Sequence, residues 1–219
     1  LVQDFDDLTG GRAAPLFAAL DRIEAQLHAQ FDQVPDVEAL ALALPLDDPA
    51  ARSPERAGGK AANLAVLSHA LPGHVPPGFV VTTTAYRRLA SDADITGLMR
   101  RLVADSTVGE AVLTAHAEAL RQRVVSTPVP PAVAEAIACA PAGTPAAGPW
   151  AVRSSGVGED GQLSFAGQFD TILGVPTERL SEAWRQVAAS RFSPRAVAYR
   201  LGGGLSEFET PMAVLVLSM

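Results

Sequence analysis

Cysteine is almost absent from this sequence, and its charges are few and unbalanced. The single cysteine, Cys139, excludes an internal disulfide and a cysteine-based metal site. The 24 acidic residues outnumber the 17 basic ones, and the net charge of −7 argues against nucleic acid or an anionic membrane as a partner for the whole surface. There is no uncharged apolar run of about 18 residues or more, and no recognisable signal peptide. The composition therefore predicts a cytoplasmic protein, in which a local cluster of cations could still bind an anion.

Apolar residues are plentiful, at 48% of the chain against 19% charged residues, which is typical of a folded globular protein. The 219 residues suffice for one large domain or two small ones. We expect residues 1–50 to form a helical extension, because apolar residues recur there at helical spacing: Leu16, Leu20, Ile23 and Leu27. Residues 51–219 are expected to form the main domain. Because the chain begins at Leu1 and stops inside an apolar run, both ends are expected to be cuts within a longer protein.

The hydrophobic pattern of the main domain predicts a mixed α/β (α+β) fold. The predicted strands are Phe79–Thr82, Trp150–Arg153, Ile172–Val175 and Met212–Leu217. The predicted helices are Gly59–Ala70, Ala85–Ala90, two or three between Ser91 and Val125, Ala132–Ala138, Thr177–Ser190, and one from Ser193 to about Tyr199. Thr83 or Thr84 is expected to cap the helix that begins at Ala85.

The stretch from Trp150 to Thr171, WAVRSSGVGEDGQLSFAGQFDT, concentrates the residues that suit binding chemistry. Arg153 and two serines follow an apolar run, and a loop with three glycines and two carboxylates comes next. A guanidinium offers a planar fork of donors, and glycines let backbone N–H groups approach an oxyanion such as phosphate. The spacing alone is equally compatible with a β-hairpin whose long loop happens to carry an arginine.

A second candidate is Lys60, which lies in the first turn of a predicted helix that follows two glycines. Free N–H groups, the helix dipole and the ammonium would all favour a phosphate there. The segment is not a P-loop, because Ala61 stands where that motif needs Ser or Thr. Without further information, a solvated lysine near a helix start is the simpler interpretation. The two histidines that stand out, His28 and His116, lie in helical patterns and are interpreted as structural or exposed residues.

Three motifs follow one another along the chain. The first is GGKAANLAVL with VPPGFVVTTTAYRRL, the second is AVRSS-x-x-x-ED-x(3)-SFAGQ-x-DT, and the third is ASRFSPRAVAYR with MAVLVLSM. In this order they resemble the ATP-binding domain of the phosphoenolpyruvate-utilising dikinases, the family of phosphoenolpyruvate synthase, pyruvate phosphate dikinase and rifampicin phosphotransferase. They cover roughly Gly58 to Met219. The resemblance implies the first part of an ATP-grasp nucleotide-binding fold.

The resemblance also implies roles for individual residues. Lys60 and Arg153 match the cations that contact ATP phosphates, and Gly167 and Thr171 match nucleotide contacts. Further nucleotide-site or loop-holding candidates are Ser155, Gln168, Glu159 and Asp160. The two adjacent carboxylates could be mistaken for metal ligands or an acid/base pair, but salt bridges to Lys60 or Arg153 are the simpler interpretation. We therefore predict that Lys60 and Arg153 converge on one anion site.

Other parts of such an enzyme are expected outside this chain. The resemblance implies that the Mg²⁺ ligands, the second ATP-grasp half, and the phosphohistidine and acceptor domains lie beyond Met219. No catalytic residue is therefore assigned within the chain, and the isolated chain is expected to be inactive. Self-association is expected through an uncovered sheet edge or apolar face at the exposed end of Met212–Leu217.

The sequence departs from the family pattern at two places. The loop between Asp160 and Ser164 is about one residue short and lacks the usual proline. Leu217 occupies the position of a glutamine expected near the nucleotide base. The favoured function is the ATP-binding part of an enzyme that passes phosphate from ATP through a phosphohistidine to pyruvate or another acceptor. The alternative is a nucleotide-binding or regulatory module that keeps the fold without turnover.

Overall fold

The computed structural model describes residue 22 and residues 41–104, 109–144, 148–157, 167–203 and 211–219. The chain divides into two compact units, residues 1–40 and Ala41–Met219. Nearly all of the helix expected around Leu16–Leu27 lies outside the described residues. The second unit therefore carries the fold described below.

The second unit alternates helices and strands, as the sequence predicts. Its strands are β1 (Ala43–Pro45), β2 (Gly78–Val81), β3 (Trp150–Gly156), β4 (Thr171–Val175) and β5 (Met212–Ser218). Its α-helices are α3 (Pro54–Ala70), α4 (Thr83–Asp92), α5 (Thr96–Ala104), α6 (Glu110–Ser126), α7 (Pro131–Cys139), α8 (Leu180–Ser190) and α9 (Pro194–Gly202). Short 3₁₀ turns are η2 (Pro49–Arg52), η3 (Ala140–Gly143) and η4 (Thr177–Arg179).

The strands form one antiparallel sheet in the order β1-β2-β5-β3-β4. In β3 and β5, Arg153 lies opposite Leu215 and Ser155 opposite Ala213. In β3 and β4, Arg153 lies opposite Thr171. Because directly opposite residues of an antiparallel pair project from the same face, the register determines which side chains share each side of the sheet.

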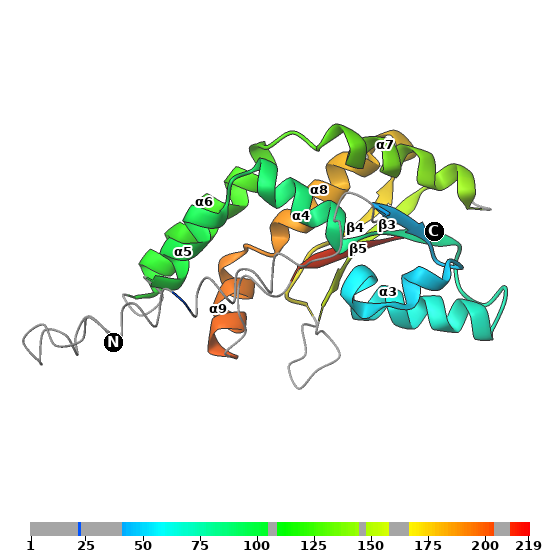
Figure 1. Ribbon diagram of the computed structural model, residues 1–219, viewed down its shortest axis with the longest axis horizontal. Helices are drawn as coiled ribbons and strands as arrows, with labels where there is room; N and C mark the ends of the chain where they lie inside the picture. Colours follow the sequence, from blue (N-terminus) through cyan, green and yellow to red (C-terminus); the bar gives the residue numbers. More distant parts are fainter. Residues whose placement is uncertain (1–21, 23–40, 105–108, 145–147, 158–166, 204–210) are drawn as a thin grey trace, which may run out of the picture. The chain divides into compact units, whose positions relative to one another are not determined.

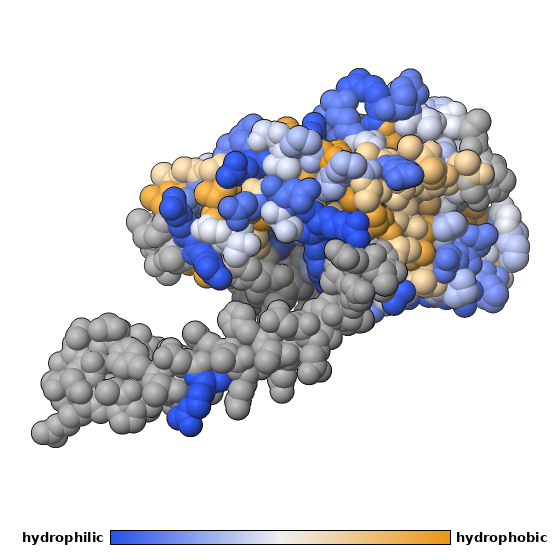
Figure 2. Space-filling model, turned by 45° about the horizontal axis from the view of Figure 1, so that its top comes forward, coloured by the Kyte–Doolittle hydropathy of each residue, from blue (hydrophilic) through white to orange (hydrophobic). Residues whose placement is uncertain are grey.

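Helices cover the two faces of this sheet unequally (Figure 1). One face packs against α4 and α8 in a large apolar core that includes Trp150, Trp184 and Phe192, all with no exposed area. The other face packs against α3, and its contacts are made mostly by alanines and by Val80 and Leu215. The outer surface of the helices on the α4 and α8 side carries both hydrophilic and apolar residues (Figure 2).

The predicted strands and helices of the main domain are confirmed, with shifts of a few residues at their ends. The expected cap of α4 is wrong, because the helix begins at Thr83 and Thr82 is its N-cap. The Thr82 hydroxyl makes no cap bond and instead donates to the Ala41 carbonyl at 2.9 Å. That bond ties α4 to the chain that enters β1, and it is a tertiary contact with no local sequence signal.

The expected helical extension to residue 50 does not agree with the structure over its last ten residues. The compact unit begins at Ala41, and the residues that follow form β1 and η2. In this segment Leu44 and Leu46 are buried against Ala57 and Ala61 of α3. Pairing with β2 supplies the backbone partners that make β1 a strand.

The expectation of an uncovered sheet edge at the last strand is also wrong. β5 lies between β2 and β3 and pairs with both along most of its length. Its apolar residues from Met212 to Val216 are buried, and exposure rises only toward Met219. Among the described strands, the edges of the sheet are β1 and β4.

Candidate functional site

Arg153 is the one exposed residue among the seven of β3. It projects from the α3 face of the sheet, because its partner Leu215 packs against α3. Its other partner, Thr171, is exposed as well. The register thus places a guanidinium and a hydroxyl side by side on the part of this face that α3 leaves open.

Gly58 interrupts α3 with a left-handed conformation (φ 71°, ψ 166°) and separates a first turn from the longer helix that follows. The regular helix therefore begins at Gly59, where the sequence predicts it. Lys60, which is half-buried, lies in its first turn. The first backbone N–H groups of a helix have no partner within the helix and need partners from elsewhere.

Strand β3 and the start of the α3 helix are directly joined. The Ala61 N–H donates to the Ser155 hydroxyl at 3.0 Å, and Ser155 has no exposed area. Ser155 is two residues from Arg153 on the same face of β3, and Ala61 is adjacent to Lys60. Lys60 and Arg153, which are far apart in sequence, therefore lie on the same side of the sheet and flank one buried joint.

The segment before β4 carries the other predicted contacts. Gly167 is exposed with φ 70°, Gln168 is half-buried, and Thr171 opens β4. The buried Oε1 atom of Gln168 has no hydrogen-bond partner in the described part of the chain. Glu159 and Asp160 lie outside the described residues, so their predicted salt bridges stay predictions.

The corner between α8 and α9 holds this segment, a role that the sequence reasoning missed. The Asp170 N–H donates to the Ser190 hydroxyl at 3.1 Å, and Ser190 in turn donates to the Val187 carbonyl at 2.7 Å. Arg195 donates to the Gly167 carbonyl. The motif ASRFSPRAVAYR was the available signal, since it contains both Ser190 and Arg195, but its spacing does not reveal what the residues contact.

Buried cations strengthen this corner. The Arg200 side chain is almost fully buried, and its guanidinium lies 5.9 Å from the centroid of the Phe169 ring. Arg200 also donates to the Arg191 carbonyl at 2.8 Å. A guanidinium near an aromatic ring is attractive, so Arg200 of α9 helps to hold Phe169, which lies two residues before β4.

Leu217 lies on the same face as Arg153, since it is opposite Ala151 in β3 and Gly78 in β2. It is partly exposed, and its side chain packs over Gly78, where an added Cβ would lie 2.9 Å from the Leu217 Cδ2. An apolar side chain offers no hydrogen bond to a base edge. Leu217, which stands where the resemblance predicts a glutamine, therefore lies on the open face that carries the predicted phosphate contacts.

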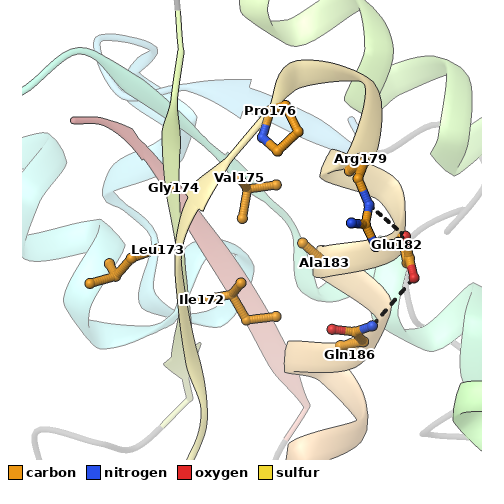
Figure 3. Close-up of a pocket in the computed structure, with 9 residues that line it drawn as sticks. All are labelled: Ile172, Leu173, Gly174, Val175, Pro176, Arg179, Glu182, Ala183 and Gln186. Carbon is orange, nitrogen blue, oxygen red and sulfur yellow. Dashed lines mark hydrogen bonds and ion pairs between the residues drawn. The ribbon is translucent and has the colours of Figure 1, made fainter.

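Two hollows among the described residues lie away from these cations. One of about 180 Å³ lies between β4 and α8 (Figure 3), where Ile172 points toward α8 and Leu173 points away from it. Its polar residues already pair with one another, because Arg179 binds Glu182 at 2.9 Å and Gln186 donates to Glu182 at 3.5 Å. A second hollow, of about 320 Å³, adjoins Gly78 and the end of α3. Neither hollow contains Lys60 or Arg153, and we assign the site by its charged groups rather than by its depth.

Charge near the start of α3 is not all positive. Ser53 donates to the Glu55 carboxylate at 2.7 Å, and this hydrogen bond lowers the pKa of Glu55.

Within the described ranges, no group of three or more His, Cys, Asp or Glu residues is arranged to hold a metal ion. In the same ranges, no helix combines the length and the apolar character needed to cross a membrane.

Comparisons with known proteins identify the family of the chain. Residues 54–219 match the family model of the pyruvate phosphate dikinase AMP/ATP-binding domain. Rifampicin phosphotransferase from Streptomyces sp is 39% identical over 181 residues, covering 81% of this chain and 21% of that protein. Phosphoenolpyruvate synthase from Aeropyrum pernix is 36% identical over 179 residues, covering 74% of this chain and 21% of that protein. The chain thus spans about a fifth of the length of these relatives. It belongs to the pyruvate phosphate dikinase and phosphoenolpyruvate synthase family, and it carries that family's nucleotide-binding domain.

Proposed function

We propose that the open α3 face of the sheet binds the phosphates of ATP. The observation that carries the proposal is the joint between Ser155 and Ala61, which sets Lys60 and Arg153 on one side of the sheet. The two cationic side chains and the exposed Thr171 hydroxyl form a donor set that suits a polyphosphate. Gly167 and the α8–α9 corner would complete the binding surface.

We further propose that the full-length protein is a phosphotransferase. In this reaction, a phosphoryl group from ATP passes to a histidine outside this chain and then to pyruvate or another acceptor. Such chemistry depends on positioning and on neutralising charge around the phosphates. In this account Lys60 and Arg153 bind and orient the phosphates, while Mg²⁺, if bound, takes ligands outside the described residues and adds further charge neutralisation.

A second candidate function is nucleotide binding without turnover. Leu217 favours it, because the residue leaves a base edge on this face without a side-chain hydrogen bond. Such a module would respond to nucleotide occupancy and would form no phosphoenzyme.

One experiment on the full-length protein separates these possibilities. ATP affinity is measured by calorimetry, and the protein is then incubated with Mg-ATP and searched for an acid-labile phosphohistidine. The proposed enzyme binds ATP and forms the phosphohistidine, whereas the module binds ATP and forms none. If ATP at millimolar concentration does not bind at all, both assignments fail.

A further inference from the structure

The regular part of α3, which begins at Gly59, is capped by a side chain of strand β3. A helix is usually capped by the side chain of the residue just before it. For the regular part of α3, which follows the kink, that residue is Gly58, which has no side chain. The Ser155 hydroxyl, 94 positions away from Ala61 in the sequence, accepts the Ala61 N–H in its place.

Gly58 allows this cap because it lets the two backbones approach closely. A Cβ on Gly58 would lie 2.6 Å from the Ser155 Oγ and would overlap the Ser155 carbonyl oxygen. Its φ of +71° is also a conformation that residues with a side chain rarely adopt. Hence both the hydroxyl of Ser155 and the missing side chain of Gly58 are needed for the same contact.

The joint connects the two predicted phosphate contacts by a short and rigid path. Ser155 is anchored in the sheet opposite Ala213, and Arg153 projects from the same face two residues earlier. On the helix side, the capped residue Ala61 follows Lys60 directly. Movement of α3 along the sheet would therefore change the position of Lys60 relative to Arg153.

We propose that Ser155 is a positioning residue of the nucleotide site, which sets Lys60 against Arg153 without touching the ligand. This inference rests on the proposed function. The resemblance suggests a direct nucleotide contact for Ser155. The proposed role differs, because Ser155 is fully buried and its hydroxyl oxygen already accepts the Ala61 N–H. The ligand class that depends on this joint is a nucleoside polyphosphate rather than the nucleoside itself.

The test uses the full-length protein with the variants Ser155→Ala and Gly58→Ala, and with Ser154→Ala as the matched control. Ser154 is buried in the same strand but faces the opposite core. We expect Ser155→Ala to weaken ATP binding about tenfold, the scale of one hydrogen bond to a buried group. Gly58→Ala should weaken it at least as much, because the added Cβ would also overlap the Ser155 carbonyl. Adenosine binding and the Ser154→Ala variant should change by less than about twofold.

Coupling to Lys60 distinguishes positioning from a general loss of structure. If Ser155 acts through Lys60, adding Ser155→Ala to Lys60→Met should weaken ATP binding little further. Equal losses for ATP and adenosine, or losses that multiply with Lys60→Met, would overturn the positioning role. Should Ser155→Ala fail to fold, Ser155→Cys keeps the side-chain volume with a weaker acceptor, and the same comparisons decide.

The two levels of the account fail in different ways. If Lys60→Met weakens ATP binding but Ser155→Ala does not, the proposed function stands and the positioning role is wrong. If neither Lys60→Met nor Arg153→Met affects ATP binding, the phosphate site itself is wrong, and the inference about Ser155 is overturned with it.

Discussion

The two faces of the sheet differ in what covers them. On the α8 face, tryptophan, phenylalanine and branched aliphatic side chains form a closed core. On the α3 face, alanines bring the helix close to the strands, and the part beyond α3 exposes Arg153, Thr171 and Leu173. Large apolar residues therefore stabilise the fold on the α8 face. On the α3 face, small residues allow the N-terminal end of the α3 helix, with Lys60, to lie near the exposed Arg153.

The largest expected effect is on the closed face. Trp184→Ala removes a fully buried ring from the core between α8 and the sheet. It should lower the free energy of unfolding by about 3–5 kcal/mol, because the cavity cannot fully collapse. Urea denaturation of the full-length protein, followed by near-UV circular dichroism, measures the loss. Arg153→Met, on the open face, should change stability by less than about 0.5 kcal/mol. Similar losses for the two variants would contradict the division between the faces.

A smaller effect is expected at Leu217, at the rim of the open face. Leu217→Gln restores a side chain that can hydrogen-bond a base, and it should tighten ATP binding by about 1 kcal/mol. We also expect the unmodified protein to discriminate weakly between ATP and GTP. The measurement is a titration of the unmodified protein and of Leu217→Gln with ATP and with GTP. Leu215→Gln is not a suitable control, because Leu215 is buried. A hundredfold preference for ATP in the unmodified protein, about 2.7 kcal/mol, would show that this interpretation is wrong.

The smallest effect is expected at the α8–α9 corner. Arg195→Ala removes the side chain that donates to the Gly167 carbonyl, and it should weaken ATP binding by about 0.5 kcal/mol, since Arg195 is exposed. Arg179→Ala is the matched control, because Arg179 is also exposed and, among the described residues, pairs with Glu182 three residues along the chain. An equal effect of both substitutions on nucleotide titrations would indicate a general charge effect rather than support of the Gly167 segment.

The sequence predicts much of this molecule because its informative signals are local. Apolar runs predict β2, β3, β4 and β5, and the glycine pair before Lys60 predicts where the regular part of α3 begins. Arg153 is a candidate because it follows a buried run and precedes a glycine loop, although that spacing alone also fits a plain β-hairpin. Each of these features depends on residues that are neighbours in the chain.

What the sequence does not predict depends on contacts between distant segments. The three-residue strand β1 exists because β2 pairs with it, and its own composition gives no periodic signal. The cap from Ser155 to Ala61 and the bond from Asp170 to Ser190 join segments that no motif spacing relates. The shape of the candidate site therefore comes from these tertiary bonds, whereas its charged residues were proposed from the family resemblance.

The most direct test of the central claim compares ATP and adenosine binding in Lys60→Met and Arg153→Met variants of the full-length protein. Arg100→Met, an exposed arginine on α5, serves as the control. If both cations hold the phosphates, each variant should lose about 1.5–3 kcal/mol of ATP binding, the scale of a charged hydrogen bond. Adenosine binding and the Arg100→Met control should be unchanged. Unchanged ATP affinity in both variants, or an equal loss for adenosine, would contradict the account.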